Sequence, residues 1–115
     1  MTTLYGIKNC DTVKKARQWL DNHDVTYTFV DIRGDGFDPA LIRRWVEAVG
    51  WETLLNRRSL SWKQLSANER DGIDKTRAIA LMEANPTLVK RPVLDHKNVI
   101  HVGFKAPDFE ALFVN

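Results

Sequence analysis

The sequence contains very little cysteine, since Cys10 is the only one among 115 residues. A single thiol cannot form a disulfide within its own chain, so sulfur chemistry at Cys10 needs a thiol from another molecule. One unpaired cysteine is typical of proteins in a reducing compartment, and it therefore favours a cytoplasmic location over secretion.

Long apolar runs and a one-sided charge are also absent. No apolar run of about 18 residues occurs, so we expect no membrane-spanning helix. The N-terminus lacks the charged and then apolar pattern of a signal peptide. The net charge is only +2, from 17 Lys+Arg and 15 Asp+Glu, and this balance does not indicate a nucleic-acid surface.

Metal-ligand spacing and glycine-rich phosphate loops are missing as well, so we expect no metal site. We interpret His23 and His96 as exposed helix-end and turn residues, and His101 as a strand residue pointing outward. The tryptophans we interpret as packing residues of the core and of a helical insert: Trp19, Trp45, Trp51 and Trp62.

The apolar content of 43% is enough for one hydrophobic core, and the length predicts a single domain over residues 1–115. Hydrophobic periodicity predicts the elements in chain order. They are a strand at 2–7, a helix at 11–22, a strand at 27–32, helices within 38–84, a strand entered from 88–94, a polar turn at 95–98, a strand at 98–102 and a helix from 106.

This order predicts an α/β fold. The first β-α-β unit needs a crossover and gives parallel strands, whereas two strands joined by a short turn form an antiparallel hairpin. Together they predict a thioredoxin-like, four-stranded mixed sheet with a helical insert at about 38–84. Within the insert, Asp38 is expected to cap a helix that Gly50 ends, and Ser66 and Glu69 fit a capping box.

Cys10 is predicted to lie where the first strand runs into the first helix. The positive end of the helix dipole and unpaired backbone N–H groups favour the thiolate, which is the nucleophilic form. The alternative is a small buried packing residue. The polar neighbours Lys8, Asn9, Asp11 and Thr12 make a poor core segment, so we favour the hypothesis of a reactive thiol.

Two arginine-containing pairs are further candidates. In a thioredoxin-like sheet a cis-proline begins the strand beside the reactive loop, and Arg91-Pro92 occupies that place; the alternative is an ordinary trans proline at a strand edge. Arg57-Arg58 is either a solvated basic pair or, if the insert folds over the Cys10 loop, the source of one guanidinium that binds an oxyanion or carboxylate.

Three segments, spaced along the whole chain, carry a resemblance to a known family: 5–10 (Tyr-Gly-Ile-Lys-Asn-Cys), 54–59 (Leu-Leu-Asn-Arg-Arg-Ser) and 88–93 (Leu-Val-Lys-Arg-Pro-Val). In this order they resemble the arsenate reductase (ArsC)/Spx family, and most of all its YffB branch of small thiol reductases. The resemblance implies a thioredoxin-like fold with a helical insert. It also implies that Cys10 attacks the substrate, that Arg58 and Arg91 bind it, and that glutathione and glutaredoxin complete the reduction.

The sequence departs from the family pattern at three places. The third oxyanion-binding arginine of the arsenate reductases is replaced within 102–104, and a histidine four residues before their cysteine is Gly6 here. Both departures weaken an arsenate site, although Lys8 supplies part of the lost positive charge. Spx regulators often carry a second cysteine where this chain has Val13, so a dithiol switch within one chain is excluded.

The residues and the resemblance together predict a glutathione-dependent thiol reductase. Cys10 is the expected catalytic residue, and the expected substrate-binding residues are Lys8, Arg58, Arg91 and Pro92. Glutathione is the expected co-substrate, with no tightly bound cofactor, and glutaredoxin or an oxidised protein thiol is a further expected partner; nucleic acid and membrane are not. The alternatives are an arsenate reductase coupled to glutathione and glutaredoxin, and a Spx-like regulator that binds RNA polymerase.

Overall fold

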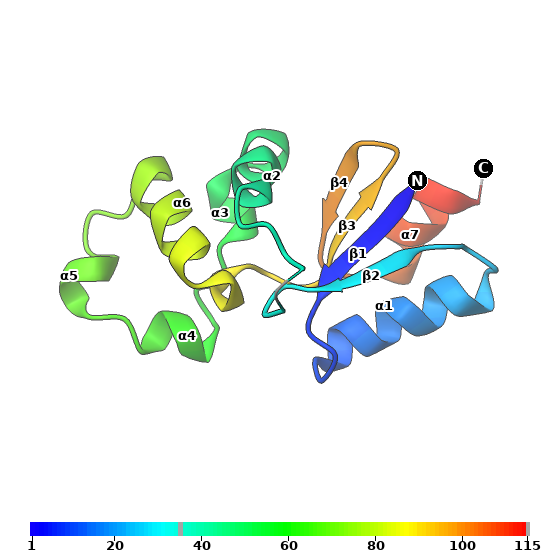
Figure 1. Ribbon diagram of the computed structural model, residues 1–115, viewed down its shortest axis with the longest axis horizontal. Coiled ribbons are helices and arrows are strands. Elements are labelled where there is room, and N and C mark those ends of the chain that lie inside the picture. The colour runs from blue at the N-terminus through cyan, green and yellow to red at the C-terminus, as the bar shows by residue number, and fades with distance from the viewer. Residues whose placement is uncertain (35, 115) are drawn as a thin grey trace. The chain divides into compact units, whose positions relative to one another are not determined.

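The computed structural model describes residues 1–34 and 36–114. The chain forms two compact units. The first, which we call the sheet unit, consists of Met1–Phe37 and Arg91–Asn115, and the second, the helical unit, consists of Asp38–Lys90. Figure 1 labels the α-helices and strands of both units.

The sheet unit holds a four-stranded sheet with the strand order β2-β1-β3-β4. β1 pairs in parallel with β2 and antiparallel with β3, and β3 pairs antiparallel with β4. The predicted α/β class with a mixed, thioredoxin-like sheet is therefore confirmed. The unit's elements are β1 (Thr2–Gly6), α1 (Asp11–Asn22), β2 (Thr28–Asp31), β3 (Val93–His96), β4 (Val99–Val102) and α7 (Ala106–Phe113).

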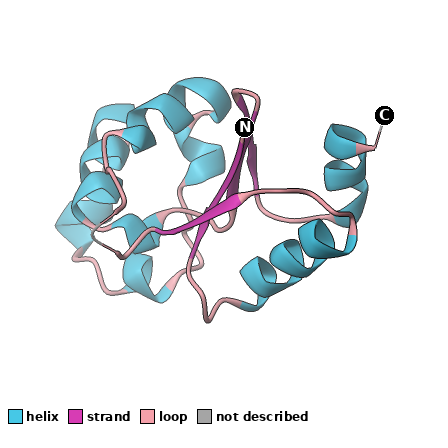
Figure 2. Ribbon diagram, turned by 45° about the vertical axis from the view of Figure 1, so that its right-hand side comes forward, coloured by secondary structure: helices cyan, strands magenta, loops and turns pink. Residues whose placement is uncertain are grey.

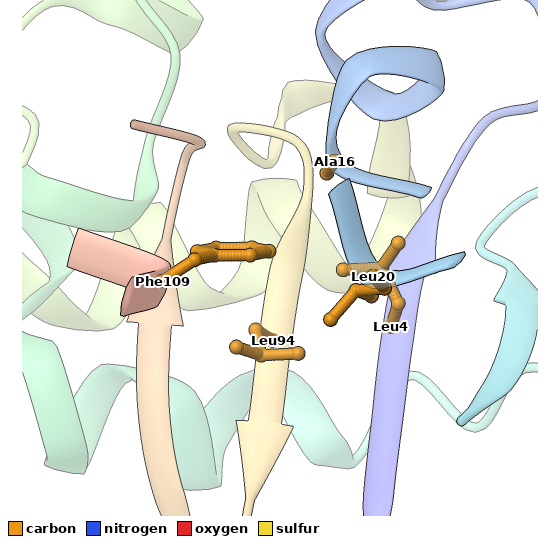
Figure 3. Packing of buried hydrophobic residues seen from close by; sticks show 5 residues of the cluster. All are labelled: Leu4, Ala16, Leu20, Leu94 and Phe109. Carbon is orange, nitrogen blue, oxygen red and sulfur yellow. The ribbon is translucent and has the colours of Figure 1, made fainter. Parts of the chain in front are cut away.

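Both helices of this unit cover the same face of the sheet. Leu4 of β1 lies directly opposite Leu94 of β3, and opposite residues of neighbouring strands point to one face. These two leucines pack with Leu20 of α1 and Phe109 of α7 in one fully buried cluster, which Figure 3 shows from close by. In Figure 2, α1 and α7 accordingly lie on one side of the strands.

The spacing of apolar residues explains α1. Val13, Ala16 and Leu20 are buried, and they repeat at the helical period along an otherwise charged segment. The ring of Trp19 meets that of Phe109 edge-on, with 5.6 Å between ring centroids. The first helix is thus fixed against the last one, and its N-terminus is held at the end of β1.

The helical unit is built from short helices. They are α2 (Leu41–Val49), α3 (Trp51–Leu54), α4 (Leu60–Lys63), α5 (Ala67–Arg70), α6 (Lys75–Ala84) and the 3₁₀-helix η1 (Pro86–Leu88). Gly50 ends α2 with φ +87°, a conformation that glycine adopts without steric cost. The predicted capping box is confirmed, because the Ser66 hydroxyl accepts the Glu69 N–H while the Glu69 carboxylate accepts the Ser66 N–H.

Three predictions of local structure are wrong. Asp38 does not cap α2, because its carboxylate accepts the N–H of Ala40 two residues later and the helix begins at Leu41. The hairpin turn is Lys97-Asn98 alone, with φ values of +50° and +68°, so His96 still belongs to β3. His101 does not point outward, because it lies opposite Leu94 on the face that the helices cover.

Candidate active site

Cys10 is the N-cap residue of α1, the position just before the first helical residue. Its side chain is half-buried, and no side-chain hydrogen bond caps the helix. Its carbonyl accepts the N–H of Lys14 at 3.0 Å, which is the first hydrogen bond of the helix. The thiol therefore sits within reach of the positive end of a 12-residue helix, as the sequence predicts.

A single tight turn joins β1 to this helix. The N–H of Cys10 donates to the carbonyl of Ile7 at 3.1 Å, so Lys8 and Asn9 form the centre of the turn, and both are exposed. Upstream of the turn, the carbonyl of Gly6 accepts the N–H of Ile32 at 3.0 Å. The segment that carries the thiol is thus fixed by hydrogen bonds at both ends.

Gly6 also allows α1 to approach the strand closely. A Cβ added at Gly6 would lie 2.7 Å from Cγ2 of Val13, whose side chain is fully buried. Atoms of real side chains do not approach so closely, and a buried valine has few other rotamers. Any side chain at position 6, including the histidine of the arsenate reductases, would therefore clash with Val13 unless the valine shifts.

Arg91-Pro92 lies at the same end of the sheet as the Cys10 turn. β1 and β3 run antiparallel with Tyr5 opposite Val93, so the residues before Val93 lie beside the end of β1. The Arg91-Pro92 peptide bond is cis, the form that the sequence left open. The carbonyl of Pro92 accepts the N–H of Gly103 at 2.8 Å, which brings the end of β4 to this place too.

The predicted site residues are therefore placed as follows. Cys10, Lys8, Arg91 and Pro92 belong to the sheet unit, and the register brings their segments to one end of the sheet; Pro92 is buried, Arg91 half-buried and Lys8 exposed. Arg58 belongs to the helical unit, where it is exposed and its N–H donates to the Asn56 side chain at 3.0 Å. Their roles toward a substrate stay predictions.

Arg57 differs from its neighbour Arg58 in its surroundings. Its guanidinium carbon lies 5.4 Å from the ring centroid of Trp51 and 5.8 Å from that of Trp62. The guanidinium therefore makes a cation–π interaction with both indoles. Sequence reasoning treated these tryptophans as packing residues and missed this cluster. The spacing of the arginine, six residues after one tryptophan and five before the other, is the signal that was available.

The histidines of the sheet lie under α7. His96 shares a 2.8 Å hydrogen bond with the Thr2 hydroxyl, and its ring contacts that of Phe113 at 4.3 Å between centroids; it is half-buried, which corrects its interpretation as an exposed residue. Burial lowers the pKa of His96, and the positive charges of Lys97 and the N-terminus lower it further. His23 is exposed, as predicted, and stacks on Trp19.

Within residues 1–34 and 36–114, no three His, Cys, Asp or Glu side chains are grouped so that they could hold a metal ion. In the same residues, no helix has both the length and the apolar character that crossing a bilayer requires.

Comparison with known proteins identifies the family. The model of the ArsC family matches residues 5–112. The chain belongs to the ArsC family. The solved structure of a YffB protein is 44% identical with a TM-score of 0.92, over 96% of this chain and 97% of that one. The structure of an arsenate reductase (ArsC) related protein from Brucella melitensis is 45% identical with a TM-score of 0.76, over 99% and 95%.

Spx regulators are more distant relatives. Global transcriptional regulator Spx 2 of Lactococcus lactis is 26% identical over 113 residues, which span 96% of this chain and 85% of the regulator. The family and the likeness to YffB that the three sequence segments predict are both confirmed. Relationship to the arsenate reductases follows from membership of the ArsC family.

Proposed function

We propose that this ArsC-family protein is a glutathione-dependent thiol reductase whose nucleophile is Cys10. The observation that carries the proposal is the place of the thiol, which is half-buried at the N-terminus of α1. A thiol held there lies beside the unpaired backbone N–H groups at the start of the helix and remains open to a substrate on one side. A packing role would instead bury the side chain completely.

The reaction follows from the presence of one cysteine. The Cys10 thiolate attacks the glutathione sulfur of a mixed disulfide between glutathione and a substrate, and the substrate sulfur leaves as a thiol after taking up a proton. A second glutathione attacks the resulting adduct, forms glutathione disulfide and releases the Cys10 thiolate. The net change converts one mixed disulfide and one glutathione into one thiol and one glutathione disulfide.

The cationic residues would bind the charged ends of glutathione. Its two carboxylates are suitable partners for guanidinium groups, which bind carboxylates through two parallel hydrogen bonds. We assign this binding role to Arg91 because it lies at the Cys10 end of the sheet. We assign it to Arg58 because of the resemblance to the arsenate reductases. Lys8 would add positive charge in the turn before the thiol, and Pro92 would shape the wall beside it.

The first test is covalent. Wild-type protein incubated with glutathione disulfide should gain one glutathione on Cys10, as measured by intact-mass and peptide mass spectrometry. The Cys10→Ser variant should gain none and should lose glutathione-dependent reduction of bis(2-hydroxyethyl) disulfide. A wild-type protein that neither forms the adduct nor reacts with iodoacetamide near neutral pH would falsify the proposal.

The second test concerns the arginines. Arg91→Gln and Arg58→Gln should each raise the KM for glutathione by about tenfold, since a hydrogen-bonded charge contributes roughly 1.5 kcal/mol or more. Lys97→Asn is the matched control, because it removes a positive charge in the hairpin turn, at the opposite end of β3 from Arg91. Equal effects of all three variants would exclude a specific role for the arginines.

Arsenate reduction is the second candidate, and the likeness to the arsenate reductase related protein favours it. In that reaction one arsenate and two glutathiones give one arsenite, one glutathione disulfide and water. Val102, Gly103 and Phe104 stand where the resemblance requires the third arginine, so we expect less turnover with arsenate than with disulfides. A coupled assay with glutathione, glutaredoxin and arsenate, compared with Cys10→Ser, decides between the two substrates.

A further inference from the structure

The helical unit contains two segments without any carboxylate. No Asp or Glu occurs in 53–68 or in 84–90, although the whole chain has 15 of them. The same segments carry four basic residues, which are Arg57, Arg58, Lys63 and Lys90. All four are exposed.

Hydrogen bonds join the two segments into one structure, which we call the basic face. The N–H of Asn56 donates to the carbonyl of Leu88 at 2.8 Å, and the N–H of Lys90 donates to that of Leu54 at 2.8 Å. A bond of 2.6 Å between the hydroxyls of Ser61 and Thr87 connects α4 with η1. The four basic residues therefore lie on two segments that are hydrogen-bonded to each other.

Aromatic rings hold one of these charges in place. Arg57 lies near the half-buried indoles of Trp51 and Trp62, at 5.4 and 5.8 Å from their centroids. Stacking leaves the N–H groups at the edge of a guanidinium free to bind a carboxylate. An arginine ordered in this way loses less side-chain entropy on binding, and arginine and tryptophan are the residues most enriched at binding hot spots.

An apolar residue is exposed beside the charges. Leu60, the first residue of α4, is 70% exposed, whereas the other leucines of the unit are buried or half-buried. Its position follows from Ser59, whose hydroxyl accepts the Trp62 N–H at 3.1 Å and caps the helix. A surface that serves only solubility would not need an exposed leucine between Arg58 and Lys63.

We propose that the basic face binds an acidic segment of a partner protein that carries a large apolar side chain. Carboxylates of the segment would bind Arg57 and its basic neighbours, and the apolar side chain would pack on Leu60 and Trp62. A protein is favoured over nucleic acid because the net charge of the chain is only +2 and a leucine contributes nothing to phosphate binding. Arg57, Leu60 and Trp62 have no part in the chemistry proposed at Cys10, whereas Arg58 is shared with the proposed glutathione site.

The test uses the full chain labelled with ¹⁵N and an acidic probe peptide of eight residues, Asp-Glu-Leu-Asp-Asp-Leu-Glu-Asp. The four indole N–H signals report on different places. The signals of Trp51 and Trp62 should shift during the titration. Those of Trp45, which is fully buried, and Trp19, in the sheet unit, should stay in place.

Variants and control ligands make the outcome decisive. Arg57→Gln and Leu60→Ser should each weaken binding by about fivefold or more, and Arg57→Lys should restore only part of the affinity because the charge remains but the planar group is lost. Lys14→Gln, an exposed charge on α1, should have no effect. The proposal is overturned if no shift occurs at 1 mM peptide, if the Asn/Gln form of the peptide binds equally well, or if a thymidine 12-mer binds more tightly.

Discussion

The sheet unit and the helical unit both bury apolar side chains, but different elements carry them. The sheet unit has one apolar cluster formed by β1, β3, α1 and α7, with Phe109 fully buried in it. Among the described residues of the helical unit, three helices have only four residues, and the side chains of Ser59 and Ser66 cap the starts of two of them. A packed sheet can hold a reactive group rigidly, whereas short capped helices leave many side chains on the surface. The candidate nucleophile lies in the first unit and the basic face in the second.

Removing side-chain volume from the core of the sheet unit should have the largest effect on stability. Phe109→Ala should reduce the free energy of unfolding by about 3–5 kcal/mol, because it leaves a cavity beneath α7. Urea denaturation followed by circular dichroism measures the change. Phe109→Leu should cost clearly less, since it refills much of the volume. Equal costs for the two variants would mean that this ring does not fill the core.

The contact between Gly6 and Val13 should give the next effect. Gly6→Ala should cost about 1–3 kcal/mol, because its Cβ would lie 2.7 Å from the valine. The same variant should change the alkylation rate of Cys10, since it moves the first turn of α1. Adding Val13→Ala should recover part of the stability, as measured by a thermal double-mutant cycle. Strictly additive costs would contradict a steric origin.

A cap in the helical unit should have a smaller and more local effect. Ser66→Ala removes the hydroxyl that accepts the Glu69 N–H at 3.2 Å, and loss of such a cap costs about 1 kcal/mol. Hydrogen exchange of the Glu69 amide should accelerate about fivefold. Exchange of the amides of β1 should not change. Acceleration in both units would show that α5 is not a separate unit of stability.

The smallest effect should be a change in how stability depends on pH. The pKa of His96 is lowered in the folded protein, chiefly by burial, so the unfolded chain binds the proton more tightly. The neutral ring therefore contributes stability above the unfolded value of about 6.5, and this contribution is lost as pH falls below it. His96→Asn should flatten the decrease of Tm between about pH 7 and pH 5. An unchanged slope would assign the decrease to other groups.

Sequence reasoning predicted the fold where a single local pattern decides it. The bounds of α1 follow from the repeat of Val13, Ala16 and Leu20, and the capping box follows from Ser66 and Glu69. The prediction extended the hairpin turn over His96 because this residue is polar. In the structure its ring is covered by Phe113, and the residue belongs to β3. That contact joins residues far apart in the chain, and no local pattern encodes it.

For the same reason, some residues of the candidate site could be predicted from the sequence and others could not. Cys10 could be located from a strand followed by a helix, and Arg91-Pro92 from its place in a known topology. The cluster of Arg57 with Trp51 and Trp62 requires the path of the chain between α3 and α4. A composition-based prediction assigns tryptophan to the core, so it overlooks rings that are only half-buried beside a charge.

The closeness of Gly6 and Val13 also limits how this chain can evolve. What opposes a side chain at position 6 is the contact that its Cβ would make with Val13. A mutational path that introduces a cation before the cysteine turn must therefore change both positions, because a side chain at position 6 clashes with Val13 and a shortened residue 13 alone leaves a cavity in the core. The two positions form an epistatic pair whose coupling is set by packing.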